Sequence, residues 1–185
     1  MTVNYPKPSA ERTALLEQIL AKALFRGEFT LSSGLQADYY VDLRRINLAG
    51  ATAPMVGRVM LETVRDLEFD AVGGLTMGAD PMATAIMYAA IAEGRAMDAF
   101  VVRKADKAHG LQRRIEGPDV AGRRVLIVED ASTTGNSPLT AVEAAREAGA
   151  EVVAVACIIE RGAAKAIEAA GLPYYAAYSL GDLGV

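Results

Sequence analysis

The sequence predicts an α/β protein with an open, mostly parallel sheet flanked by helices. Short apolar runs alternate with segments of helical periodicity, which is the order that parallel strands and crossover helices produce. The run Val125–Val128 is followed by two acids, as expected for a strand that is buried on both faces and ends at a polar edge. A length of 185 residues suits one domain with a sizeable core, so we expect residues 1–185 to form a single unit.

The N-terminal part departs from this alternation. Apolar residues at helical spacing predict a helix over 11–26, with Ser9 as its cap and Gly27 at its end. Two short strands follow, over 29–34 and 38–44, joined by a Ser-Ser-Gly turn. We expect a small N-terminal hood contributed mainly by about residues 1–45, with a plain surface hairpin as an equal alternative.

The remaining elements follow in regular order. Periodicity predicts helices over 51–67, 82–92, 138–149 and 163–170, and strands over 69–75, 98–103, 151–159 and 173–178. Asp80 is expected to cap the second of these helices and Ser137 the third, each with a proline at the first helical position. Met77, Met82 and Met87 are expected in the core.

Composition narrows the class of protein. The net charge is −4 and the pI near 5.1, which argues against a general nucleic-acid binder. The single Cys157 lies in an apolar run and is expected to be a buried structural thiol. No apolar run reaches the length of a membrane span and no signal-peptide core is visible, so we expect a cytoplasmic protein without a membrane partner.

The segment after Val128 carries the strongest chemical signal. Glu129 and Asp130 come first, and then a run of small polar residues at the start of a helix: Thr133, Thr134, Gly135, Asn136 and Ser137. A helix start with hydroxyls and free backbone N–H groups suits a phosphate. Carboxylates beside it suit sugar hydroxyls or a Mg²⁺ ion. The combination predicts a sugar-phosphate site, although an ordinary strand, turn and capped helix would also contain such residues.

Two further features place charge near this site. Arg161 follows the apolar strand 151–159 and can bind a planar carboxylate in bidentate fashion, although a pairing with Glu160 is the plain alternative. Residues 103–117 combine cations with the only histidine of the chain and show no periodicity. We expect a long loop there, and a functional lid over about 104–118 is favoured over a solvated charged loop.

The strand, acid pair and Thr-Thr-Gly order resembles the PRPP-binding signature of the type I phosphoribosyltransferases. The lid residues Arg103, Lys104, Lys107 and His109-Gly110 resemble the orotate phosphoribosyltransferase family within them, as do Leu31–Gly34 and Tyr40–Asp42. Ser32 stands where that family usually has a lysine, and the loop 76–81 contains no lysine.

The resemblance implies transfer of ribose 5-phosphate from PRPP to orotate in pyrimidine (UMP) biosynthesis. It implies that residues 133–137 hold the 5-phosphate, that Glu129 and Asp130 hold the ribose, and that Thr133 and Arg161 face orotate. The lid cations Arg103, Lys104, Lys107 and His109 would contact pyrophosphate, with Lys107, His109 and Asp130 as catalytic residues. Mg²⁺ is expected mainly through PRPP rather than through direct protein ligands.

The resemblance also implies a homodimer in which the lid of one subunit completes the site of the other. Two alternatives remain at this point. One is a phosphoribosyltransferase for another base. The other is a regulator that binds PRPP or a nucleotide without catalysis, which the missing lysines favour.

Overall fold

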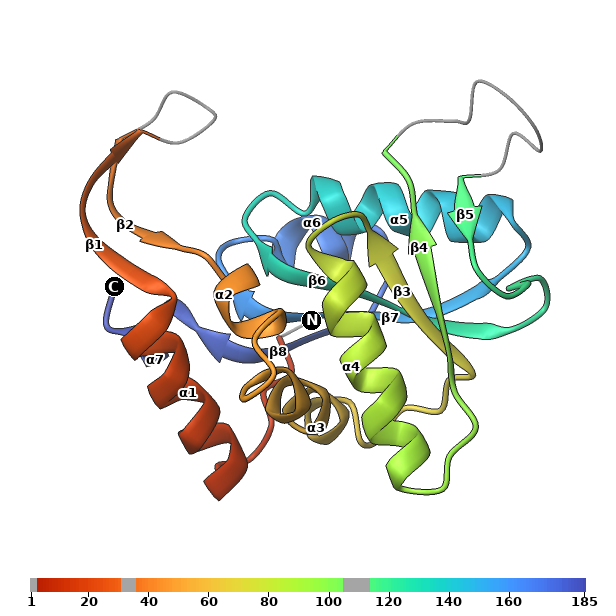
Figure 1. Cartoon of the computed structure of the whole chain (residues 1–185). Helices are drawn as coiled ribbons and strands as arrows, with labels where there is room; N and C mark the ends of the chain where they lie inside the picture. The colour runs from red at the N-terminus through yellow and green to blue at the C-terminus, as the bar shows by residue number, and fades with distance from the viewer. Residues whose placement is uncertain (1–2, 31–35, 105–113) are drawn as a thin grey trace.

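The computed structural model describes residues 3–30, 36–104 and 114–185, and its centre is a six-stranded sheet in the order β5-β4-β3-β6-β7-β8. Figure 1 shows this sheet with helices on both sides and a separate hairpin at one end. The strands of the main sheet are β3 (Ala71–Leu75), β4 (Asp98–Val102), β5 (Ile115–Glu116), β6 (Arg124–Ser132), β7 (Glu151–Glu160) and β8 (Tyr174–Ser179). All neighbouring pairs are parallel except β4 and β5.

Alternate residues of the central strand β6 face two cores. Leu126 and Val128 pack into a cluster with α1 (Ala10–Lys22), α2 (Arg44–Asn47), α3 (Ala53–Thr63) and α4 (Ala79–Ala92). Val125 and Ile127 face the other cluster, with α5 (Asn136–Glu147) and α6 (Ala164–Ala169). Burial on both faces explains the continuous apolar run. The predicted α/β architecture is therefore confirmed.

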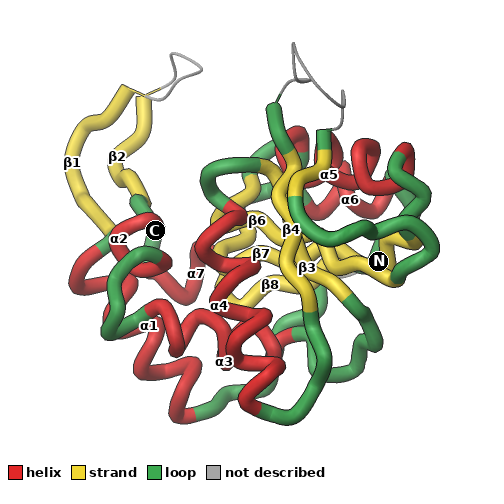
Figure 2. The backbone as a smooth tube through the Cα atoms, turned by 45° about the vertical axis from the view of Figure 1, so that its right-hand side comes forward, coloured by secondary structure: helices red, strands yellow, loops and turns green. Residues whose placement is uncertain are grey.

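A two-stranded antiparallel hairpin stands apart from the main sheet. Its strands are β1 (Leu24–Thr30) and β2 (Gln36–Val41), which we call the hood hairpin; Figure 2 shows it beside the helical layer. Leu24 pairs with Val41, so the chain leaves α1 and enters the hairpin almost at once. This pairing shortens the predicted helix, which ends at Lys22, and places Gly27 inside a strand. The turn 31–34, which includes Ser32, lies outside the described residues.

Three local predictions about caps and core residues are wrong. Gly78, and not Asp80, occupies the N-cap of α4, and Asp80 accepts a hydrogen bond from the Thr76 hydroxyl at 2.7 Å. Gly135, and not Ser137, occupies the N-cap of α5. Met77 is 68 % exposed, although Met82 is fully buried as expected. Each error arises because the chain turns earlier than the prolines indicate.

Three short elements were not predicted. The first is helix α2, which begins at Arg44, where a strand was expected. Ile115 and Glu116 form β5 against β4, so the sheet includes part of the range expected to be a lid. A C-terminal turn of helix, α7 (Leu180–Leu183), is closed by a capping box between Ser179 and Asp182. The final strand β8 completes the edge of the main sheet rather than the hood hairpin. Cys157 is buried as predicted, with its sulfur 3.0 Å from the Tyr174 hydroxyl. None of the helices in the described ranges has the length and apolar character that a membrane crossing requires.

Candidate functional site

A polar cleft of about 340 Å³ opens at the carboxyl ends of the central strands, which is where open α/β sheets bind ligands. We call it the acidic cleft. It lies between the end of the hood hairpin, the loop after β3 and the end of β6. Four residues predicted for the site line it, namely Lys104, Glu129, Asp130 and Ser137.

The acid pair lies within strand β6 rather than after it. Glu129 pairs with Cys157 of the neighbouring strand and is 6 % exposed. Its carboxylate accepts a hydrogen bond from the Asp130 backbone N–H at 3.0 Å, and the Asp130 carboxylate accepts one from Ala131 at 2.7 Å. The strand backbone therefore holds both carboxylates at the cleft.

The two acids differ in their surroundings. Burial, and after it the negative charge of Asp130, raise the pKa of Glu129 to about 8, while the positive charge of Lys104 acts in the opposite direction. Near neutral pH the empty site therefore favours a protonated Glu129 beside Asp130. A cation or a sugar hydroxyl that enters the cleft changes this balance, because a nearby positive charge favours the ionised form.

The hydroxyl-rich segment 133–137 surrounds the start of α5. Gly135 has φ +81°, a conformation that L side chains rarely adopt, and it turns the chain from strand to helix. Thr133, Thr134, Asn136 and Ser137 are exposed, so no packed side chains cover this helix start. Because the first N–H groups of a helix have no partner within it, the segment can bind a phosphate.

The loop after β3 approaches the acid pair very closely at Gly78. A Cβ atom at Gly78 would lie 2.6 Å from one Glu129 carboxylate oxygen and 3.1 Å from one Asp130 oxygen. Only a residue without a side chain permits this approach. The loop thus forms the wall of the cleft that faces the acids.

The predicted cations are only partly described. Lys104 is exposed and lines the cleft, whereas the Arg103 guanidinium lies 3.6 Å from Glu116 at the sheet edge. Lys107 and His109 lie outside the described residues. Of the two predicted lid cations that the structure describes, Lys104 lies at the acidic cleft.

Arg161 follows β7, the strand beside β6. Its backbone N–H donates to Ser132 at 2.9 Å, and its guanidinium carbon lies 5.4 Å from the centre of the Tyr39 ring. The Glu160 carboxylate instead accepts hydrogen bonds from the backbone of Gly162 and Ala164. The alternative pairing of Arg161 with Glu160 is thus not what holds this side chain.

Several cleft residues were missed by sequence reasoning. Tyr40 belongs to the hood hairpin, Asp42 follows it and Arg44 begins α2. Thr76 and Met77 come from the loop after β3. Arg44 donates to Asp42 at 2.8 Å and lies 3.4 Å from the Tyr40 hydroxyl. The Tyr40–Asp42 segment was the sequence signal that could have indicated these residues, because it places an aromatic and a charged side chain at the end of a predicted strand.

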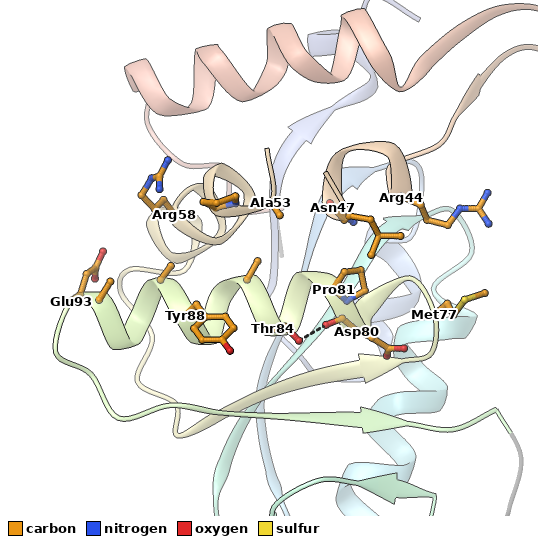
Figure 3. Close-up of a pocket in the computed structure, with 15 residues that line it drawn as sticks. Arg44, Asn47, Ala53, Arg58, Met77, Asp80, Pro81, Thr84, Tyr88 and Glu93 are labelled. Atoms are coloured by element: carbon orange, nitrogen blue, oxygen red, sulfur yellow. Dashed lines mark hydrogen bonds between the residues drawn. The ribbon is translucent and has the colours of Figure 1, made fainter. Parts of the chain in front are cut away.

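A larger groove of about 870 Å³ lies beside the cleft, between α2, α3 and α4. Figure 3 shows its lining, with Pro81 of α4 directed toward Asn47 of α2, and with Ala53 and Arg58 on α3. We call it the apolar groove. Arg44 and Met77 line both hollows, so the groove continues into the cleft.

In the described residues, no group of three or more His, Cys, Asp or Glu side chains is arranged to hold a metal ion. The acid pair offers two adjacent carboxylates at the cleft, whereas the carboxylate of Asp42 is paired with Arg44. Such a pair suits Mg²⁺ that arrives with substrate phosphates, because this ion keeps most of its ligands from water and substrate.

A buried strand with two acids near its carboxyl end, followed by an open helix start, is the arrangement expected of the phosphoribosyltransferase class. Residues 48–170 match the phosphoribosyl transferase domain family, in agreement with this geometry.

The relatives specify the branch of that class. An orotate phosphoribosyltransferase from Streptomyces avermitilis is 68 % identical over 177 residues, which cover 94 % of this chain and 97 % of the relative. The crystal structure of the Mycobacterium tuberculosis orotate phosphoribosyltransferase with Fe(III) dicitrate aligns with a TM-score of 0.85 and 54 % identity, over 95 % of this chain and 99 % of that one. The same enzyme in complex with PRPP aligns with a TM-score of 0.82 and 50 % identity, over 95 % and 99 %. The chain belongs to the orotate phosphoribosyltransferase family.

Proposed function

We propose that this protein transfers the 5-phosphoribosyl group from PRPP to N1 of orotate, which gives orotidine 5′-monophosphate and pyrophosphate in UMP biosynthesis. The observation that carries the proposal is the end of β6, which presents Glu129 and Asp130 in the same cleft as the start of α5. A ribose phosphate has hydroxyls for the acids and a phosphate for the helix start. The family relationship supplies the acceptor base. We further propose that the reaction takes place in the cytoplasm.

The 5-phosphate end is assigned to residues 133–137. Thr133, Thr134, Asn136 and Ser137 are exposed around the left-handed Gly135, so their hydroxyl and amide groups are accessible to an anion. The positive end of the α5 dipole adds to this attraction. The phosphate would therefore fix one end of PRPP before chemistry begins.

The acid pair is assigned to the ribose. As the bond to pyrophosphate breaks, the ribose gains positive charge, and Asp130 beside it favours that charge. We assign Asp130 a catalytic role and Glu129 a substrate-binding role. The close wall at Gly78 limits how far either carboxylate can move.

The leaving pyrophosphate is assigned to the cations. Lys104 already lines the cleft, and Arg103 stands at the end of β4 beside it in sequence. Lys107 and His109 are proposed to contact pyrophosphate as well, with His109 as a proton donor. Mg²⁺ bound with PRPP would neutralise further charge on the leaving group.

Orotate is assigned to Arg161 and Thr133. The hydrogen bond from the Arg161 backbone to Ser132 places both residues beside the end of β6. A guanidinium matches a planar carboxylate better than an ammonium does. Arg161 would thus select orotate over bases that lack a carboxylate.

We also propose a homodimer that forms through the apolar groove and in which the lid reaches the partner's site. Leu48, Met77 and Tyr88 are each at least 65 % exposed and line the groove, which is an unusual amount of apolar surface to leave in water. Asn47 is 3 % exposed, yet no described residue bonds its side-chain amide. A second copy that covers the groove can satisfy it. Since the groove continues into the cleft, that copy would lie next to the active site.

The test is a product assay with PRPP, Mg²⁺ and a panel of bases. We expect stoichiometric pyrophosphate and orotidine 5′-monophosphate with orotate, and no product with uracil, adenine or hypoxanthine. Arg161→Lys should raise the KM for orotate at least tenfold, because the bidentate contact is lost. Turnover with another base would assign a different substrate, and PRPP binding without turnover of any base would indicate a regulator.

A further inference from the structure

We infer that Tyr39 of the hood hairpin is a positioning residue for Arg161, and that it sets the affinity for orotate without affecting PRPP. This inference rests on the proposed function and deepens it, because it names the contact that orients the base-reading guanidinium. The two residues lie 122 positions apart in the sequence (161 − 39) and come from different sheets.

The backbone of Arg161 is fixed, but its guanidinium is not. The backbone N–H donates to Ser132, and the preceding Glu160 is engaged with the first N–H groups near α6. The Nε atom of Arg161 is buried, and no described residue accepts a hydrogen bond from it. No hydrogen bond to a described residue therefore fixes the guanidinium at this atom, and the orientation of its plane depends on the other groups that it contacts.

The ring of Tyr39 provides a contact that can orient the guanidinium of Arg161. Its centre lies 5.4 Å from the guanidinium carbon of Arg161, within the range of a cation–π contact. Tyr39 is half-buried and packs against the core cluster below α1 and α3, so the ring itself is held. The ring therefore limits the orientations of the guanidinium plane.

Orientation matters here because the donors of a guanidinium form a planar fork. A guanidinium held in one plane binds a carboxylate with two parallel hydrogen bonds. A mobile guanidinium binds more weakly, because its side chain must be ordered when the ligand binds. Tyr39 would thereby couple the hood hairpin to recognition of the base. PRPP is assigned to the acid pair, the start of α5 and the cations, and the acidic cleft includes neither Tyr39 nor Arg161, so its binding would not sense the change.

The experiment compares Tyr39→Leu with Tyr39→Phe by steady-state kinetics. Tyr39→Leu removes the ring, and we expect the KM for orotate to rise about tenfold while the KM for PRPP stays within about twofold. Tyr39→Phe keeps the ring and should restore the wild-type KM for orotate. Phe25→Leu is the matched control, because Phe25 belongs to the same hairpin and its ring lies 5.1 Å from the guanidinium of Arg45 of α2, an arginine to which no substrate is assigned.

Equal increases in both KM values, or an unchanged KM for orotate in Tyr39→Leu, would overturn the inference. So would Tyr39→Phe behaving like Tyr39→Leu, since the hydroxyl and not the ring would then be responsible. A wild type that makes no orotidine 5′-monophosphate would refute the proposed function instead. Calorimetric titration with orotate would then decide the inference alone: binding weakened only in Tyr39→Leu supports it, and no binding to the wild type rejects it.

Discussion

At the scale of single residues, the shape of the acidic cleft depends on the lack of a side chain at Gly78. Gly78 has φ −65°, which any residue adopts, so backbone freedom is not the reason for glycine there. The reason is space, because a Cβ would come within 2.6 Å of Glu129. A Cβ at this position would therefore displace the carboxylate of Glu129, which belongs to the candidate site.

Gly78→Ala should therefore impair activity more than stability. We expect kcat/KM for PRPP to fall at least tenfold as the acid pair is displaced, with a loss in the free energy of unfolding of about 1 kcal/mol. Gly50→Ala is the control, since a Cβ there meets nothing within 4 Å. Steady-state kinetics and urea unfolding measure the two effects. A proportionate loss of stability and activity in Gly78→Ala would contradict this explanation.

The raised pKa of Glu129 predicts how the stability of the protein without substrate depends on pH. Its pKa is raised from 4.5 to about 8 on folding, so the folded protein holds more protons than the unfolded chain between these values. The free energy of unfolding then falls as the pH rises through this window. Glu129→Gln removes the effect, and its stability relative to wild type should grow between pH 5 and 8 by at most about 1.4 kcal/mol per pH unit.

Urea unfolding at several pH values measures this difference. Glu143→Gln is the control, because Glu143 is exposed on α5 and its replacement changes the net charge by the same amount as Glu129→Gln. Parallel stability curves for wild type and Glu129→Gln would show that Glu129 ionises as freely in the folded protein as in the unfolded chain.

At the scale of elements, the phosphate segment depends on how β6 joins α5. Gly135→Ala forces a left-handed conformation on an L residue and brings a Cβ to 3.0 Å from Ala166 of α6. We expect the free energy of unfolding to fall by about 1–2 kcal/mol for the conformation alone, and more for the contact. The KM for PRPP should rise, because the helix start moves.

Gly122→Ala separates these two causes. Gly122 has φ +70°, but a Cβ there meets nothing within 4 Å, so only the conformational cost applies. Thermal or urea unfolding of the two variants gives the difference. If both lose the same stability and both keep the wild-type KM for PRPP, the packing of Gly135 against α6 has no part in the site.

At the scale of the whole molecule, the apolar groove connects assembly to activity. Tyr88→Asp places a charge in the proposed interface, and we expect sedimentation analysis to show a monomer with reduced turnover. Leu20→Asp is the control, since Leu20 is exposed on α1 outside the groove. A Tyr88→Asp dimer with normal activity would place the interface elsewhere.

Much of the fold was predictable from sequence because it depends on local patterns. Strand burial on both faces shows as a run of apolar residues, and Val125–Val128 is such a run. Apart from β5, the order of helices and strands from 51 to 178 follows from periodicity. Boundaries were less accurate: Leu24–Arg26 continued a helical pattern, but pairing of Leu24 with Val41 outweighed it. Long-range hydrogen bonds leave no mark in the local sequence.

The sequence by itself predicted that the acid pair, the hydroxyl-rich helix start and Arg161 lie at one edge of the sheet, because each comes next to a recognisable apolar run and the ends of parallel strands meet at one edge. The tertiary structure alone decided that Tyr39 lies under Arg161, that Gly78 abuts Glu129 and that Met77 is exposed beside the groove. These facts depend on how the hood hairpin and the loop after β3 pack against strands distant in the chain, and such packing is a property of three-dimensional contacts rather than of residue order.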